Sequence, residues 1–419
     1  MAERFQAPRG TFDVLPTSSH ARAQVHDAAA EIFARAGYGR VETPIFESTE
    51  LFSRGVGDAT DIVRKEMFTF TDQGDRSLTL RPEGTAPIAR AYVEHGMHKL
   101  AQPVKLWYSG SYFRHERPQA GRFHQFNQIG AESIGSDSPL VDAELIVLLD
   151  GFLRELGVPG VRLRLSSLGT TETRATYREE LRKHLRAHES ELSHDVRERI
   201  DENPLRAFDA DDEGTKGVME SAPMMVDRLD RNDAEHLAEV RTLLDQAGVT
   251  YELDGTLVRG LDYYTRTVFE FESSSLGAQS ALGGGGRYDG LVAALGGPAT
   301  PGCGWAAGIE RILLALDELG PAPSIDVFVT APDGRRDRAF AIVRELRGAG
   351  LRAELDQAGR SIKGQMKQAD RVGAGRVVIL DDEGGAAVRD MKSGEQRELD
   401  LARVVEAVST NGGEADGRS

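Results

Sequence analysis

Two stretches of the sequence place arginines beside aromatic or acidic side chains. The first, RGLDYYTRTVFEF at residues 259–271, starts with Arg259 and carries Tyr263 and Tyr264 before a run that alternates like a β-strand. The second, RHERPQAGR at residues 114–122, holds three arginines and one histidine within nine residues. Separated arginines suit phosphoryl or nucleotidyl transfer, in which catalysis rests mostly on positioning and charge neutralisation.

The strand that follows the basic loop has one face of mixed chemistry. Alternation places Phe126, Gln128, Gly130 and Glu132 on that face. The ring offers a plate for stacking, the amide and carboxylate can orient polar groups, and the glycine leaves room. Such a face suits a ligand better than a hydrophobic core.

A further arginine, Arg311, lies on a helix predicted at residues 308–316, opposite its apolar stripe. The segment TPGCGWAAG at residues 300–308 leads into this helix and carries three glycines. Glycine permits close backbone approach, so an arginine placed here could meet a phosphate.

Each of these features also has an ordinary structural explanation, and the residues alone leave both open. Neighbours in a strand point to opposite faces, so Tyr263 and Tyr264 share a core only where the sheet is covered on both sides. A tyrosine pair is more often half-buried, with hydroxyls bonded to the backbone. A basic hairpin tip is more often a solvated loop, and Arg311 alone is more often a surface side chain.

Several familiar site motifs are absent from the sequence. The glycine run at residues 283–286 has neither the GxxxxGK[ST] nor the strand–GxGxxG–helix pattern of nucleotide-binding loops. No cluster of histidine, cysteine or acidic residues has structural zinc spacing, and no GxSxG motif occurs. The sequence therefore predicts a site without a catalytic nucleophile.

The composition is that of a globular protein. The chain has 419 residues, of which 40% are hydrophobic and 28% charged, and one cysteine, Cys303, so it forms no internal disulfide. Neither a signal peptide nor an apolar run long enough to span a bilayer is found, which predicts a cytoplasmic protein without a membrane partner. The net charge of −16 argues against general binding of nucleic acid or anionic membranes. A polyanion must therefore meet a local basic patch.

The elements that must position these residues follow from periodicity and turn signals. A strand ending at residue 81 leads into a helix opened by Thr85, and residues 105–132 form a long hairpin. Charged helical sequence at about 170–230 indicates an insertion. After a linker at 318–324, strands and helices alternate, which predicts a terminal α/β domain.

Taken together, the motifs resemble the histidyl-tRNA synthetases, a family of class II aminoacyl-tRNA synthetases. The resemblance covers essentially the whole chain. The three class motifs are similar to residues 8–47, 113–132 and 308–316, and alone they are degenerate. RGLDYYTRTVFEF and GGGGRYDGL, at 259–271 and 283–291, resemble the two motifs peculiar to the histidine enzymes.

The resemblance implies a role for each matching side chain. Arg114 and Arg259 would hold the α-phosphate of ATP during in-line attack by the histidine carboxylate, and Arg311 the γ-phosphate. Phe126 would stack on adenine, Glu116 would reach its amino edge, and Arg122 would also contact ATP. The histidine-binding residues implied are Glu83, Gly84 and Thr85 of the RPEGT turn, Gln128, Glu132, Tyr263, Tyr264 and Tyr288. Of these, Glu132, Tyr264 and Tyr288 would hydrogen-bond the imidazole.

The implied architecture is an α+β catalytic domain at residues 1–323, built on an antiparallel β-sheet flanked by helices, as in class II synthetases. It carries the helical insertion and precedes an α/β anticodon-binding domain at 324–409 and a disordered tail at 410–419. The implied substrates are L-histidine, ATP and tRNA(His), with Mg²⁺ accompanying ATP, and the implied assembly is a homodimer. Protein ligands for Mg²⁺ are not evident in the sequence.

Two departures from the family pattern stand out. Trp305 occupies a position where a smaller aromatic such as phenylalanine is expected, and the basic character of the terminal domain is weak. The second departure leaves the anticodon contacts unassigned, although RNA recognition also works through stacked bases and a few polar contacts.

Three other functions compete with this interpretation. A regulatory subunit that partners a short ATP phosphoribosyltransferase resembles the catalytic core, but usually lacks the anticodon domain and parts of the arginine and RGLDYY motifs. A class II synthetase for another amino acid is disfavoured by the two histidine-type motifs. A pure RNA-binding module is disfavoured by the acidic charge.

Overall fold

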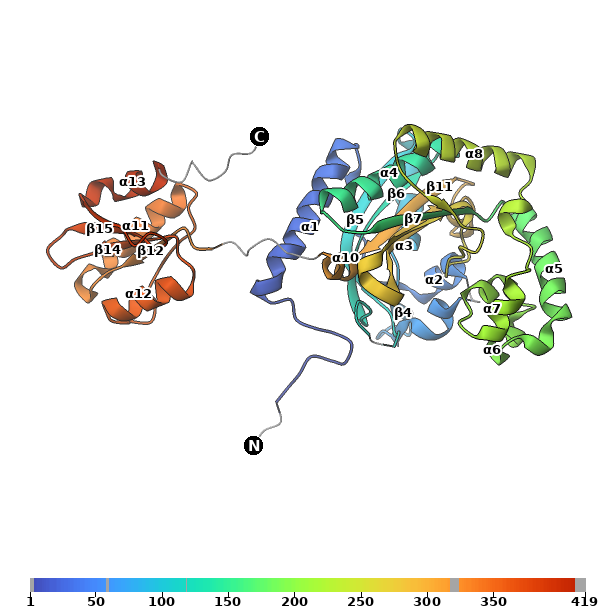
Figure 1. Ribbon diagram of the computed structural model, residues 1–419, viewed down its shortest axis with the longest axis horizontal. Coiled ribbons are helices and arrows are strands. Elements are labelled where there is room, and N and C mark those ends of the chain that lie inside the picture. The colour runs from blue at the N-terminus through green and yellow to red at the C-terminus, as the bar shows by residue number, and fades with distance from the viewer. Residues whose placement is uncertain (1–3, 58–59, 118, 317–323, 411–419) are drawn as a thin grey trace. The chain divides into compact units, whose positions relative to one another are not determined.

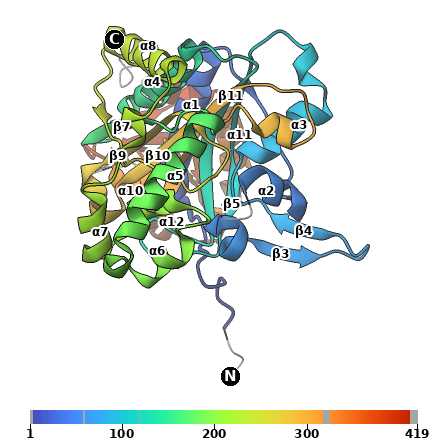
Figure 2. The same cartoon turned by 90° about the vertical axis from the view of Figure 1, so that its right-hand side faces the viewer.

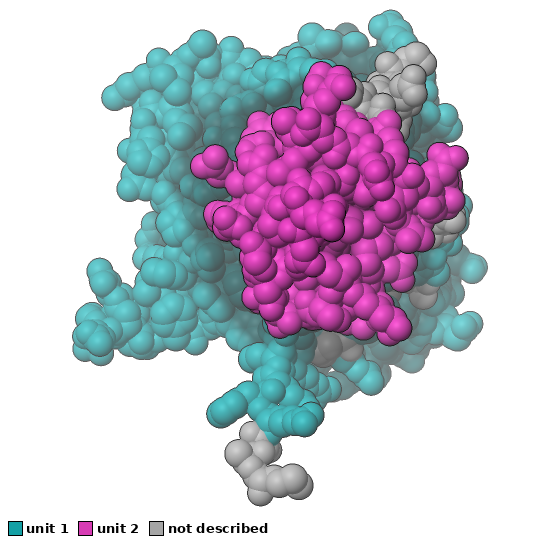
Figure 3. All heavy atoms as spheres, turned by 90° about the vertical axis from the view of Figure 1, so that its left-hand side faces the viewer, with its two compact units in different colours: residues 1–320 teal, residues 321–419 magenta. Residues whose placement is uncertain are grey.

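The computed structural model describes residues 4–57, 60–117, 119–316 and 324–410, which belong to two compact units (Figure 1). The units comprise residues 1–320 and 321–419 and are coloured separately in Figure 3. The domain boundary predicted at residue 323 lies outside the described residues, as do residues 411–419 of the predicted tail, whereas Thr410 is the last residue of a helix. Across the described ranges, no helix has the length and hydropathy needed to cross a bilayer.

The first unit is built on an eight-stranded sheet of order β1-β5-β6-β11-β10-β9-β7-β8. Every pair from β5 to β7 in that order is antiparallel, whereas β1 pairs with β5, and β8 with β7, in parallel. The strands are β1 (Gly39–Arg40), β5 (Val104–Phe113), β6 (Gln125–Ile134), β7 (Val161–Ser167), β8 (Glu252–Leu253), β9 (Thr265–Ser273), β10 (Ala281–Arg287) and β11 (Gly302–Gly308). The predicted antiparallel sheet is confirmed.

Helices flank the sheet on both faces, as predicted. The main core lies between one face and the helices α1 (Pro16–Arg35), α4 (Pro139–Glu155), α8 (Arg231–Gln246) and α10 (Ile309–Ala315). Trp305 is part of this core, where its ring lies 5.7 Å from that of Phe33 in a tilted contact. Buried and partly buried tyrosines of the other face pack against α2 (Thr49–Val56), α3 (Thr85–Glu94) and α9 (Leu291–Ala294).

The segment at residues 170–230 is helical and has a core of its own. It contains α5 (Thr171–Ala187), α6 (His194–Arg199) and α7 (Glu213–Met219), whose buried side chains form one cluster. Side chains at the caps of these helices, Thr170, Ser193 and Asp212, accept hydrogen bonds from backbone N–H groups of the first turn. The charged sequence folds because its few apolar residues lie on one face of each helix.

A second, three-stranded sheet of order β2-β4-β3 was not predicted as a whole. It comprises β2 (Phe46–Ser48), β3 (Phe68–Thr71) and β4 (Ser77–Leu80), and the β3–β4 hairpin is visible in Figure 2. The strand ending near residue 81 was predicted, whereas β3 lies among polar loops and is mostly exposed. Because β3 is short and exposed, its alternation of apolar and polar residues is weak. Asp72 stabilises the turn of the hairpin, since its Oδ1 accepts the N–H groups of Gly74 and Arg76.

The second unit is an α/β domain on a five-stranded sheet of order β13-β12-β14-β15-β16. The predicted alternation is present in β12 (Val327–Thr330), α11 (Arg336–Gly348), β13 (Ala353–Leu355), α12 (Ile362–Arg371), β14 (Arg376–Leu380) and α13 (Val404–Thr410). The structure adds an unpredicted antiparallel hairpin, β15 (Ala386–Asp390) and β16 (Gln396–Leu399). The pattern of β16 is weak because this strand is polar and mostly exposed.

Candidate active site

A cavity of about 350 Å³ in the first unit brings together most of the residues singled out in the sequence. The predicted residues that line it are Glu83, Gly84, Thr85, Arg114, Glu116, Arg122, Phe126, Gln128, Arg259, Tyr263, Tyr264 and Arg311. Glu132 and Tyr288 lie directly behind this lining, linked to it through Thr85. A larger cavity, of about 460 Å³, lies between the insertion and residues 61–66 and is lined by no aromatic side chain.

Both tyrosines of the 259–271 stretch line the cavity. The expectation that they point to opposite faces of a strand is wrong, because β9 begins at Thr265 and the pair lies in the preceding turn. Outside the pleated strand, the rings of Tyr263 and Tyr264 pack edge to face, with centroids 4.7 Å apart. Because they lie in this turn, both tyrosine rings can face the same cavity.

Glu132 on β6 is fully buried and accepts three hydroxyl hydrogen bonds. The donors are Thr85 Oγ1 at 2.8 Å, Tyr108 Oη at 3.2 Å and Tyr288 Oη at 2.7 Å. Burial raises the pKa of Glu132 to about 8. The carboxyl group therefore titrates near neutral pH in the structure as it stands.

Tyr108 was not predicted as a site residue. It lies on β5, in the strand KLWYSGSYF, where alternation places it on the same face as Tyr112. Gly84 and Gly130 make room for its ring: an added Cβ would lie 2.6 Å and 2.4 Å from ring carbons of Tyr108. The glycine at position 130, noted in the sequence as leaving room for a ligand, first leaves room for this tyrosine.

The turn at residues 81–85 is held by its own glutamate. Glu83 accepts the backbone N–H groups of Thr85 at 2.8 Å and Ala86 at 2.9 Å, so it caps the first turn of α3. Tyr263 Oη donates to the same carboxylate at 3.4 Å, and burial raises the pKa of Glu83. Close by, the amide oxygen of Gln128 is buried and has no hydrogen-bond partner among the described residues. This oxygen is an acceptor that a ligand N–H could satisfy.

The hairpin arginines form a charged rim with Phe126. The Arg114 guanidinium lies 5.4 Å from the Phe126 ring centroid, while Arg114 Nε donates to the carbonyl of Pro82 at 2.9 Å. Glu116 is an ion-pair partner of both Arg114, at 3.6 Å, and Arg122, at 3.4 Å. Two of the loop's three arginines, Arg114 and Arg122, thus line the cavity, whereas Arg117 is exposed.

Two further arginines come from distant segments. Arg259 forms an ion pair with Glu270 of β9, and its Nε is buried without a partner among the described residues. Arg311 Nη1 donates to the carbonyl of Ala281 at 2.7 Å. Burial, with the nearby charge of Arg122, lowers the pKa of Arg311. A polyanion in the cavity would neutralise these groups.

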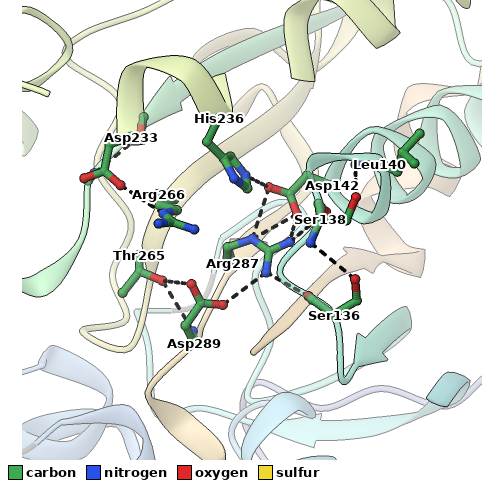
Figure 4. A network of polar contacts seen from close by, with 12 residues as sticks. Ser136, Ser138, Leu140, Asp142, Asp233, His236, Thr265, Arg266, Arg287 and Asp289 are labelled. Atoms are coloured by element: carbon green, nitrogen blue, oxygen red, sulfur yellow. Dashed lines mark hydrogen bonds and ion pairs between the residues drawn. The ribbon is translucent and has the colours of Figure 1, made fainter. Parts of the chain in front are cut away.

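Behind the tyrosines, a buried ion-pair network holds the end of β10 (Figure 4). Arg287 and Asp142 are both fully buried and paired, and His236 Nε2 lies 2.7 Å from Asp142 Oδ2. Arg287 also donates to the carbonyls of Ser136 and Ser138, at 3.0 and 3.1 Å. The network fixes the backbone one residue before Tyr288, the tyrosine that donates to Glu132.

Comparisons with known proteins follow the same division of the chain. A family model described as histidyl-tRNA synthetase matches residues 10–312, and one described as an anticodon binding domain matches residues 326–411. A histidine–tRNA ligase of Rubrobacter xylanophilus is 49% identical over 409 residues, covering 94% of this chain and 96% of that protein. The chain belongs to the histidyl-tRNA synthetase family.

Other members of the histidyl-tRNA synthetase family match this chain over nearly its whole length. A histidine–tRNA ligase of Halothermothrix orenii is 48% identical over 410 residues, covering 96% of this chain and 98% of that protein. The crystal structure of an apo S. aureus histidyl-tRNA synthetase superposes with a TM-score of 0.82 at 36% identity, covering 97% of this chain and all of that one. The class II architecture predicted from the motifs is confirmed.

One solved structure bears on the competing regulatory function. A Bacillus halodurans protein, described as an ATP phosphoribosyltransferase regulatory subunit/histidyl-tRNA synthetase, superposes with a TM-score of 0.68 at 23% identity over 90% of this chain. This similarity shows a shared fold alone. In the present chain, Arg114, Arg259, Arg311 and the Tyr263–Tyr264 pair line one cavity.

The cavity offers no cage for a metal ion. Within the parts of the chain that the structure describes, no group of three or more histidine, cysteine or acidic side chains is placed to hold one. Of the carboxylates that line the cavity, Glu116, Glu270 and Glu310 are paired with arginines, and Glu83 accepts two backbone N–H groups. These residues do not fit a protein-bound cation, so no protein ligand for Mg²⁺ is assigned.

Proposed function

We propose that the protein ligates L-histidine to tRNA(His) at the expense of ATP, through a histidyl-adenylate, releasing pyrophosphate and then AMP. The observation that carries the proposal is the convergence of Arg114, Arg259 and Arg311 on a cavity that also opens onto Gln128 and the Tyr263–Tyr264 turn. One side of the site suits a triphosphate and the other an amino acid. Family membership supports the same assignment.

The first step needs positioning rather than a base. A carboxylate oxygen of histidine attacks the α-phosphorus of ATP, a new P–O bond forms, and the bond to pyrophosphate breaks. Arg114 and Arg259 hold the α-phosphate and offset the charge that builds on its oxygens. Arg311 holds the γ-phosphate of the leaving group, and Mg²⁺ arrives with ATP as its counter-ion.

The adenosine part of ATP takes the hairpin side of the cavity. Adenine stacks on the Phe126 ring, whose centroid lies 5.4 Å from the Arg114 guanidinium. Glu116 accepts from the adenine amino group, and Arg122 contacts the phosphates. The Glu116 ion pairs with both arginines pre-arrange this side for the nucleotide.

Histidine takes the tyrosine side of the cavity. Its α-amino group binds at Glu83, Gly84 and Thr85 and donates to the unpartnered amide oxygen of Gln128. The imidazole hydrogen-bonds to Glu132, Tyr264 and Tyr288, and Tyr263 lies beside the imidazole ring. A site that hydrogen-bonds both ring nitrogens favours histidine over amino acids that lack them.

The second step transfers the histidyl group to a ribose hydroxyl at the 3′ end of tRNA, and AMP leaves. The second unit is assigned to the anticodon, in keeping with the family model that matches residues 326–411. The functional assembly is proposed to be a homodimer in the cytoplasm, on the strength of the family resemblance. Sedimentation equilibrium of the purified chain tests the dimer.

The test of the proposed function is amino-acid-dependent ATP–pyrophosphate exchange, measured with each standard amino acid in turn. Exchange with histidine alone, followed by charging of tRNA(His), is the expected result. A folded protein that binds histidine but exchanges with no amino acid would overturn the proposal in favour of the regulatory function.

A further inference from the structure

The helical insertion reaches the Tyr263–Tyr264 turn through one arginine. Arg174 lies near the start of α5, and its Nη1 donates to the main-chain carbonyl of Tyr264 at 2.5 Å. Tyr264 is 4% exposed and is the last residue before β9. Arg174 itself does not line the cavity, so it acts on the site through the backbone.

The residues that follow the turn are attached to the loop that enters the insertion. The main-chain carbonyl of Arg266 accepts the N–H of Leu168 at 2.7 Å, and the main-chain N–H of Arg266 donates to the carbonyl of Gly169 at 2.8 Å. Its φ is +47°, which a residue with a side chain seldom adopts. The start of β9 is therefore shaped by contact with the insertion's first end rather than by strand pairing alone.

Asp233 on α8 ties the two ends of the insertion together (Figure 4). Its carboxylate is fully buried and accepts Thr170 N–H at 2.7 Å, Thr173 Oγ1 at 2.9 Å and Arg266 Nε at 2.9 Å. Burial opposes ionisation, yet these hydrogen bonds hold the pKa of Asp233 below its ordinary value. The first turn of α5 is thus anchored next to Arg174.

We propose that Arg174 is a positioning residue for amino-acid binding. Through it the insertion fixes the backbone of the Tyr263–Tyr264 turn, and with it the orientation of both rings in the cavity. The inference rests on the proposed function, since it assigns a residue outside the cavity to the shape of its histidine pocket. Without the guanidinium, the carbonyl loses a charged donor and the turn is free to shift.

The experiment compares three variants of the full chain by histidine affinity, measured calorimetrically, and by KM for histidine and for ATP in exchange. Arg174→Ala is expected to weaken histidine binding by about ten-fold, the scale of one charge-assisted hydrogen bond, with KM for ATP little changed. Arg174→Lys keeps a charged donor and is expected to recover most of the affinity.

Arg182→Ala is the matched control. Arg182 lies two turns further along α5, and its partners, Glu179 and Asp201, both lie inside the insertion. It tests the stability of the same helix without touching the turn, so histidine affinity is expected to stay at the parent value.

Histidine binding by Arg174→Ala at the parent affinity would overturn the proposal. So would an equal loss in Arg174→Ala and Arg182→Ala, which would mark a general effect on the insertion. If the alanine variant does not fold, Arg174→Gln takes its place against Arg174→Lys, under the same criteria. If the parent chain binds no histidine, the proposed function is overturned as well. If the parent binds histidine and Arg174→Ala binds it equally well, only this inference is overturned.

Discussion

Glu132 combines full burial with three hydroxyl donors, and this combination defines the residue-scale chemistry of the site. Its carboxyl group can hold a proton or give it up near neutral pH, because its pKa is raised to about 8 by burial. An imidazole can exist with or without its second proton in the same range. Under the proposed function, Glu132 and the substrate imidazole would exchange protons in overlapping pH ranges.

The raised pKa of Glu132 makes the free energy of unfolding depend on pH. Between the unfolded pKa near 4.5 and the folded value near 8, the folded chain holds a proton that the unfolded chain has lost. Stability from this group is therefore full below about pH 4.5 and falls as pH rises to about 8, by on the order of 1.4 kcal/mol per pH unit. Glu132→Gln is expected to remove this slope, measured by urea denaturation of both proteins at several pH values. A parent-minus-variant difference that is constant with pH would contradict it.

Arg259 is expected to act on the chemical step. Arg259→His should leave the fold intact and slow adenylate formation by ~10²-fold or more, because a charge donor positioned on the α-phosphate is lost. Pre-steady-state ATP–pyrophosphate exchange measures the rate, and far-UV circular dichroism checks the fold. Arg162→His is the control: Arg162 lies on β7 with 67% of its side chain exposed, near Glu272 at 3.7 Å. Activation of histidine at the parent rate by Arg259→His would remove Arg259 from the proposed mechanism.

At the scale of elements, the close approach of β6, β10 and β11 lets a carboxylate and a tyrosine lie beneath the cavity. Gly304 on β11 pairs with Glu132 on β6, and a Cβ at position 304 would lie 1.6 Å from Glu132 Oε2. The contact explains in physical terms why the approach to α10 is rich in glycine. A side chain there would need the space that the carboxylate fills.

Gly304→Ala is therefore expected to be more harmful than an ordinary glycine substitution. Overpacking of this kind costs about 1–3 kcal/mol or more, and it would displace Glu132, so histidine affinity should fall with stability. Urea denaturation and calorimetric titration with histidine measure the two effects. Gly290→Ala is the matched control, since a Cβ there meets nothing within 4 Å. Equal stability and affinity in the two variants would contradict the prediction.

At the scale of the whole molecule, every residue assigned to histidine and ATP lies in the first unit, and the second unit has its own core. The proposed function therefore assigns activation of the amino acid to the first unit and recognition of the anticodon to the second. The acidic net charge of −16 is compatible with tRNA binding where recognition depends on stacked bases and local contacts.

A chain cut after residue 323 is accordingly expected to exchange pyrophosphate with histidine at nearly the parent rate but to charge tRNA(His) poorly. The reason is that the adenylate site is intact while the unit assigned to the anticodon is missing. Exchange and charging assays on both chains measure the split. Charging by the shortened chain at the parent rate would contradict the role given to the second unit, and the full-length chain, assayed in parallel, is the control.

The sequence by itself determined the antiparallel sheet, the charged helices of the insertion and the alternating strands and helices of the terminal unit, and it supplied the motifs from which the site residues are proposed. These follow from patterns within short stretches: the alternation of β6, the glycine and arginine motifs, and the charged helices at residues 170–230. Local patterns also failed where strands are short and exposed, as in β3 and β16.

Tertiary structure alone decided which distant groups meet. The Tyr263–Tyr264 pair faces one cavity because it lies in a turn, which the strand period could not indicate. Tyr108 joins Glu132, and Arg174 reaches Tyr264, across separations of 24 and 90 residues. Such contacts depend on how the sheet and insertion pack, and no periodicity within a segment encodes them, because hydrogen bonds between segments are set by distance in space rather than along the chain.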